Sequence, residues 1–404
     1  MTEMIKLAAI FLLMVLVLKF TRALPWAIGL ASVAVILLFR LDIPVALKIA
    51  GKSVISRLTI TTLLAFYFIT FLQRMLERKG KLNRAHEALN RIFNNRRINA
   101  SLAPMMIGML PSAGVINICG QIVDKATDKY LNVEEKAFVT TYYRHVAESF
   151  LPTFPSVIIG ANLAGFSLTA CLVGMIPIVI LIIGSGFVFY LRKVPKSTGT
   201  VASENKAKEV LAFFQSLWPL FLIVILVIVF KLPVFLPVMG MAIVSIFINH
   251  LTLPELKAMI VSAFEKRMLF TTVFIMIFKD LLIEANVISI LPEMFGRLPL
   301  PSFIIYMLIV FFGAIISGQQ AINVVVFPIV FMAGSRQDLP LFLLLMASGY
   351  CAMQVSPTHI CLAYVTEYFK VSFGGVVKKT IPVIMPILVL ACLYYLLLKY
   401  VLML

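Results

Sequence analysis

The stretch LDIPVALKIAGKSVISRLTITT at residues 41–62 recurs in altered form as LTLPELKAMIVSAFEKRMLFTT at residues 251–272. The positions that stay identical after a displacement of 210 residues are Leu41, Pro44, Arg57, Thr61 and Thr62. The same order of apolar segments follows each copy. A repeat of this length predicts that the chain is built from two related halves.

The composition is that of a membrane protein with many spans. Hydrophobic residues make up 61% of the 404 residues, whereas soluble domains are about half apolar. Apolar stretches of about 20 residues, the length that crosses a bilayer, recur throughout. The net charge of +17 comes from lysines and arginines in short segments beside these stretches. That pattern is typical of cytoplasmic membrane loops and argues against a nucleic-acid partner.

We therefore predict an all-α polytopic membrane protein made of two inverted repeats. The first repeat covers residues 1–191, the second covers residues 210–404, and a cytoplasmic linker at 192–209 joins them. Each repeat is expected to contain five spans, a re-entrant helical hairpin and a broken helix. An odd number of crossings makes the second repeat upside down relative to the first. The expected spans are 4–18, 24–39, 55–76, 137–165 and 167–191, then 210–230, 233–249, 267–283, 340–368 and 380–402.

The distribution of charge predicts the orientation. Residues 74–97 hold eight lysines and arginines against two glutamates, and we interpret them as a helix on the cytoplasmic surface. The loop at 284–297 is acidic, with Glu284 and Glu293 against one arginine. This loop and both termini are expected to be external.

Four breaks interrupt the apolar segments in two matched pairs, at residues 111–114 and 151–155 and at residues 317–320 and 354–359. Backbone that leaves helical geometry at membrane depth must be buried in protein or line a wet cavity. Half-helix N-termini at such breaks attract anions, and freed carbonyls hold cations. The expected substrate- and ion-binding residues are Ser112, Gly114, Asn117, Thr153, Ser317, Gln319, Gln320, Asn323, Ser356 and Thr358.

Ionisable side chains inside spans are costly and usually functional. Arg144, His145 and Glu148 precede the break at 151–155, and His359 follows the break at 354–359. We expect these residues to form a proton path or a gate, or else to stay hydrated in a cytoplasmic vestibule. Two histidines and one carboxylate do not indicate a metal site. None of the five cysteines forms a C-x-x-C pair, so no zinc site or disulfide framework is indicated and no cofactor is expected.

Three short stretches resemble a known family when they are taken with this architecture. They are Leu110-Pro111-Ser112-Ala113-Gly114, Tyr143-Arg144-His145-Val146-Ala147-Glu148 and Ser356-Pro357-Thr358-His359. The chain resembles the ion transporter superfamily of gluconate permeases, citrate carriers and divalent-anion/sodium symporters. It looks closest to a prokaryotic branch, the domain-of-unknown-function 401 family.

The resemblance implies a location in the prokaryotic inner or plasma membrane. It also implies that the hairpin tips and broken helices hold substrate and coupling ion in a moving transport domain. The other spans would form a scaffold and the contact of a homodimer. Both hairpins lack the Ser-Asn-Thr signature of the dicarboxylate branch, so neither dicarboxylate specificity nor sodium coupling follows from the resemblance.

The function expected from these features is ion-coupled secondary active transport, in the manner of a symporter. The substrate would be a small organic anion, a carboxylate or a sugar acid, and H⁺ or Na⁺ would be the coupling ion. Access would alternate by an elevator or rocking movement. A channel is the alternative interpretation. An intramembrane enzyme is less favoured, because H-E-x-x-H, G-x-S-x-G and P-loop motifs are absent from the sequence.

Overall fold

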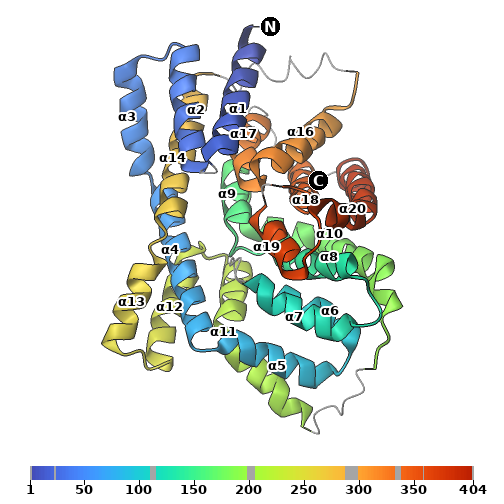
Figure 1. Cartoon of the computed structure of the whole chain (residues 1–404). Helices are drawn as coiled ribbons and strands as arrows, with labels where there is room; N and C mark the ends of the chain where they lie inside the picture. The colour runs from blue at the N-terminus through green and yellow to red at the C-terminus, as the bar shows by residue number, and fades with distance from the viewer. Residues whose placement is uncertain are drawn as a thin grey trace.

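The computed structural model describes residues 2–21, 24–109, 115–197, 205–286, 299–332, 338–357 and 359–402. Within these ranges the chain is predominantly helical and contains no β-strand, apart from an isolated bridge between Asn95 and Ser197. Figure 1 shows helices of the two halves interleaved in one body. The prediction of an all-α protein is confirmed for the described residues.

The first half of the chain contains α1 Thr2–Thr21, α2 Leu24–Leu38, α3 Ile43–Val54, α4 Arg57–Arg78, α5 Lys81–Phe93, α6 Arg96–Ile107, α7 Val115–Thr127, α8 Val133–Arg144, η1 Ala147–Ser149, α9 Pro155–Ala164, α10 Leu168–Phe189 and η2 Leu191–Lys193. The second half contains α11 Lys206–Val229, α12 Phe235–Ile248, α13 Leu253–Ala263, α14 Lys266–Glu284, α16 Ser302–Ser317, α17 Gln319–Met332, α18 Leu339–Met353, α19 Ile360–Phe369, α20 Phe373–Leu396 and the π-helical turn η3 Leu397–Val401.

Most helices lie within a few residues of the positions predicted from hydropathy. The two segments expected to be broken, 137–165 and 340–368, are each divided into two helices, α8 with α9 and α18 with α19. The helix α3 was not expected. It has only twelve residues and carries Lys48 and Lys52, so its hydropathy does not reach that of a span.

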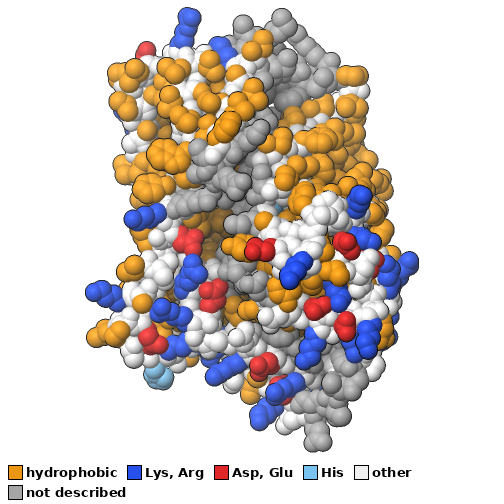
Figure 2. All heavy atoms as spheres, viewed as in Figure 1, with side chains coloured by type: hydrophobic (Ala, Val, Ile, Leu, Met, Phe, Trp, Pro, Cys, Tyr) orange, Lys and Arg blue, Asp and Glu red, His pale blue; other side chains and the backbone are white. Residues whose placement is uncertain are grey.

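The surface is apolar over a broad band. Among the described residues, four helices, α4, α10, α11 and α20 with η3, are long and apolar enough to cross a membrane, and six further apolar helices are shorter. Ile55 and Phe247 are each 72% exposed. Figure 2 shows hydrophobic side chains over the upper part of one face, whereas charged side chains gather over its lower part. Soluble monomers rarely expose so much contiguous apolar surface, and the fold is compatible with a membrane protein.

The two halves pack against each other reciprocally. The helix α4 of the first half contacts α12 and α13 of the second, and α14 of the second half contacts α2 and α3 of the first. The same exchange occurs among the shorter helices, because α9 contacts α17 and α19 contacts α7. Figure 1 shows α3 and α13 near opposite ends of the molecule.

Ion pairs join the basic end of α4 to the second half. Arg74 Nη2 lies 2.9 Å from Glu265 Oε1, and Lys79 Nζ lies 3.0 Å from Glu255 Oε1. Glu255 also closes a capping box with Thr252 at the start of α13. The backbone amide of Thr252, followed by the Lys79 ammonium, lowers the pKa of the Glu255 carboxyl to about 2. The carboxylate therefore stays ionised in all ordinary buffers.

Gly108 lets α6 approach the end of α8 closely. It is the C-cap of α6, and a β-carbon at this position would overlap the carbonyl oxygen of Arg144. Because backbone atoms move less readily than a side-chain tip, only glycine fits here without displacing the end of α8.

We expect Gly108→Ala to destabilise the protein by about 1–3 kcal/mol, the usual cost of overpacking a close contact. Gly51→Ala in α3 is the matched control, because a β-carbon at Gly51 meets nothing within 4 Å. The control should be neutral or slightly stabilising. Thermal unfolding in detergent measures both variants. Equal melting temperatures for Gly108→Ala and the parent protein would show that α6 and α8 are not in close contact.

Candidate functional site

Two breaks in the helices create the site. The first break, residues 145–154, separates α8 from α9, and the second, residues 354–359, separates α18 from α19. Pro155 occupies the first turn of α9, where its missing amide hydrogen costs nothing. Pro152 and Pro357 lie inside the breaks, and proline disfavours helical geometry at the residue before it.

The two breaks meet at a pair of histidines. The rings of His145 and His359 lie 4.5 Å apart between centroids at an angle of 65°. Cys361, in the first turn of α19, lies close to both histidines. One ligand atom from each of these three residues lies within 4.8 Å of the others, and all three side chains are buried. These residues, the histidine–cysteine cluster, could together hold a metal ion.

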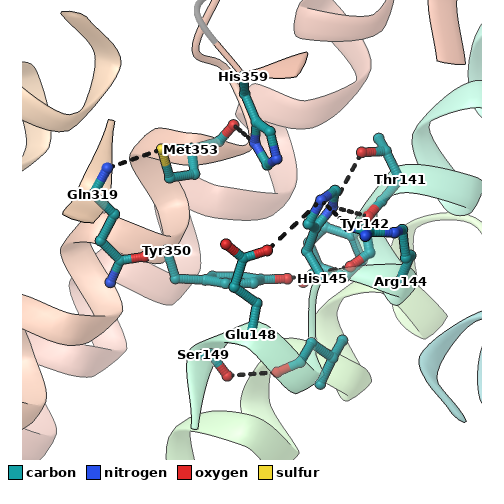
Figure 3. Close-up of polar contacts among 11 residues, drawn as sticks. Thr141, Tyr142, Arg144, His145, Glu148, Ser149, Gln319, Tyr350, Met353 and His359 are labelled. Carbon is teal, nitrogen blue, oxygen red and sulfur yellow. Dashed lines mark hydrogen bonds and ion pairs between the residues drawn. The ribbon is translucent and has the colours of Figure 1, made fainter. Parts of the chain in front are cut away.

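The environment of His145 is defined by α8. Its Nδ1 lies within hydrogen-bonding distance of the backbone carbonyl of Thr141 and 3.2 Å from the Thr141 hydroxyl. Its Nε2 lies 2.7 Å from Nη1 of Arg144 and 3.8 Å from Oε2 of Glu148. Figure 3 shows the Glu148 carboxylate turned toward His145 and beside the ring of Tyr350. Arg144, His145, Glu148 and His359 are thus one group, as the sequence suggested from their positions beside the breaks.

The start of α17 lies against α18. Gln319 is buried, its backbone amide donates to Met353 Sδ at 3.2 Å, and its Nε2 donates to the carbonyl of Met346 at 3.3 Å. Gly349 leaves room for the Gln319 side chain, since a β-carbon there would lie 2.8 Å from Gln319 Cγ. Gly318 precedes α17 with a φ of 86°, which glycine adopts without strain. Gln320 is half-buried in the first turn of α17.

Thr153 lines a cavity of about 150 Å³. The same cavity is lined by Thr70 and Gln73 of α4 and by Glu265 at the start of α14. Thr153 itself donates to the carbonyl of Met109 at 3.3 Å. Ser356 in the second break donates to the carbonyl of Ile315 at 2.6 Å. Each break is therefore tied to a neighbouring element of its own half.

Several buried polar atoms in this region have no hydrogen-bond partner among the described residues. Both amide atoms of Gln354 are unpaired although the residue is 1% exposed, and so are Oδ1 of Asn323 and Oγ of Ser156. An unpaired buried polar group costs about 1–3 kcal/mol. Such a cost is typical of a site that a ligand or water completes.

Some predicted site residues lie outside the described residues. They are Ser112, Gly114 and Thr358. Asn117 and Ser317 belong to α7 and α16, but their side chains also lie outside what is described.

The sequence analysis missed Cys361, Gln354 and the polar wall on α4. The spacing His359-x-Cys361 was a usable signal for the first. For the last, the signal was Thr70, which directly follows the apolar run at residues 63–69 of α4, together with Gln73.

Residues 3–398 match one family model, which is described as Protein of unknown function (DUF401). No match was found among curated proteins. Because the family model covers nearly all of the sequence, the chain belongs to the DUF401 family.

Proposed function

We propose that this protein is an ion-coupled secondary active transporter of a small organic anion, in the class of carboxylates and sugar acids. The observation that carries the proposal is the meeting of two broken helices from different halves of the chain around buried charged and polar side chains. Broken helices at a repeat interface are the usual binding sites of secondary transporters. A soluble enzyme would not need its polar centre to interrupt two apolar helices.

The reciprocal packing of the two halves supports an inverted repeat. The contacts of α4 with α12 and α13 mirror those of α14 with α2 and α3. These pairs match the sequence repeat, since α4 and α14 begin near Arg57 and Arg267. We propose repeats at residues 1–191 and 210–404, with the 192–209 linker in the cytoplasm and both termini external.

The chemistry of the breaks favours an anion. Arg144 is a buried cation beside His145, and guanidinium groups suit carboxylates better than any other side chain. The N-termini of α9 and α17 add positive partial charge near Thr153 and Gln319. The unpaired amide of Gln354 supplies both a donor and an acceptor.

We propose that the helices α6–α9 of the first half and α16–α19 of the second half move together as the transport domain. The helices α1–α4 and α11–α14 would form the scaffold and the contact of a homodimer. In this mechanism the Arg144, His145, Glu148 and His359 group forms the gate between the breaks. Movement of one domain past the other would change which side of the membrane reaches Thr153 and its cavity.

Solute counterflow in proteoliposomes tests the proposal. A thermal-shift screen of carboxylates and sugar acids, with and without Na⁺ and at several pH values, first selects the solute. Liposomes loaded with unlabelled solute should then take up the labelled form, and an H⁺ or a Na⁺ gradient should drive net uptake. Gln319→Leu should lower affinity about ten- to hundredfold, whereas the exposed Gln215→Leu in α11 should not. Ionic current without exchange would identify a channel, and neither current nor exchange would refute transport.

Maleimide labelling in intact cells and in inverted vesicles tests the proposed topology. Single cysteines replace Ser197, before the second half, and Asn286, after α14. Four of the five native cysteines are buried and Cys392 is half-buried, so a background lacking Cys392 suffices. We expect Ser197→Cys to react only from the cytoplasmic side and Asn286→Cys only from outside. Labelling of both positions from one side would contradict the inverted arrangement.

A further inference from the structure

We propose that His145, His359 and Cys361 bind a divalent metal ion, for which zinc is the best fit. Their ligand atoms lie within 4.8 Å of one another, and the residues are 1%, 7% and 4% exposed. A thiolate with two imidazoles selects zinc or a similar transition metal and disfavours magnesium and calcium, which take oxygen ligands. Metal binding here does not depend on which solute the protein transports.

The hydrogen bonds of both histidine rings prepare their Nε2 atoms as ligands. His145 Nδ1 lies at the carbonyl of Thr141, and His359 Nδ1 lies 3.0 Å from the carbonyl of Met353. A carbonyl only accepts, so each ring must donate its Nδ1 hydrogen and keep a lone pair on Nε2. Histidines that bind metals are held in this way by outer-shell acceptors. The arrangement occurs twice, once on each break.

The contact between Arg144 and His145 independently indicates that Nε2 of His145 carries a lone pair. Nη1 of Arg144 lies 2.7 Å from Nε2 of His145. A guanidinium group has donors only, so Nε2 of His145 must be the acceptor in this contact. A metal ion would take the place of that donor. Glu148, whose Oε2 lies 3.8 Å from the same nitrogen, is outside the three-residue cluster and would complete a four-ligand set only after its side chain turns toward the ion.

The geometry and the charge both suit zinc after a small contraction. Bonds of about 2.0–2.3 Å in a tetrahedral site put ligand atoms about 3.5 Å apart, roughly 1 Å closer than the widest separation here. When zinc binds, the Cys361 thiol releases its proton and becomes a thiolate ligand. The thiolate and the Glu148 carboxylate together offset the two positive charges of the ion, and the buried Arg144 keeps its own charge beside the site.

The consequence is a bridge between the two halves of the chain. His145 belongs to the first break, whereas His359 and Cys361 belong to the second. An ion held by all three would join the ends of α8 and α19 and would resist their separation.

Cobalt(II) titration of the purified protein, carrying no polyhistidine tag, tests the site. Cobalt replaces zinc in tetrahedral sites, and a cysteine ligand gives it a thiolate-to-metal charge-transfer band in the near ultraviolet. We expect this band at one equivalent of Co²⁺ and its loss when Zn²⁺ is added. Cys361→Ser, which keeps the size of the side chain, should abolish the band. His359→Ala should weaken metal affinity more than about a hundredfold, because even outer-shell changes cost 10- to 100-fold.

Cys392→Ser and the exposed His250→Ala are the matched controls, and both should keep the band and the affinity of the parent protein. A thermal melt of each monodisperse variant separates lost binding from lost folding. Zn²⁺ should raise the melting temperature of the parent and of both controls, but not that of Cys361→Ser. Absence of the band from the parent protein, or its persistence in Cys361→Ser, would overturn the proposal.

Discussion

The arrangement of this protein depends on the burial of charged and polar groups at two breaks in apolar helices. Arg144 and His145 are almost completely buried where α8 ends. Removing an ion from water costs several kcal/mol, so such groups persist only where partners surround them. Here the partners come from both halves of the chain, through Glu148 on one side and His359 on the other. Gly108 and Gly349 then allow the neighbouring elements to close around the breaks.

Much of the helix order could be predicted from the sequence, because hydropathy and the repeat report on local properties. The divisions between α8 and α9 and between α18 and α19 were predictable because Pro152 and Pro357 cannot continue a helix. The sequence grouped His145 with His359 by their positions beside the breaks, but it did not place Cys361 with them, because that contact depends on how the two halves pack. Thr70 and Gln73 of α4 were missed because they line a polar cavity only when α4 packs beside the first break, a contact between residues about 80 positions apart.

The proposed transport and the proposed metal binding would use different groups near the two breaks. The cavity beside Thr153 and the unpaired amide of Gln354 have the polar groups that a small anion would need. The histidine–cysteine cluster has the thiol and imidazoles that zinc prefers.

The most direct test of this account is whether the two breaks touch in the membrane. His145→Cys and His359→Cys are combined in a background without the native cysteines, and a protease site is inserted between the exposed residues Lys196 and Ser197. After mild oxidation in native membranes and proteolysis, the account predicts that both halves stay joined on a non-reducing gel and separate on reduction. Two separate fragments before reduction, as found with either single cysteine, would contradict it.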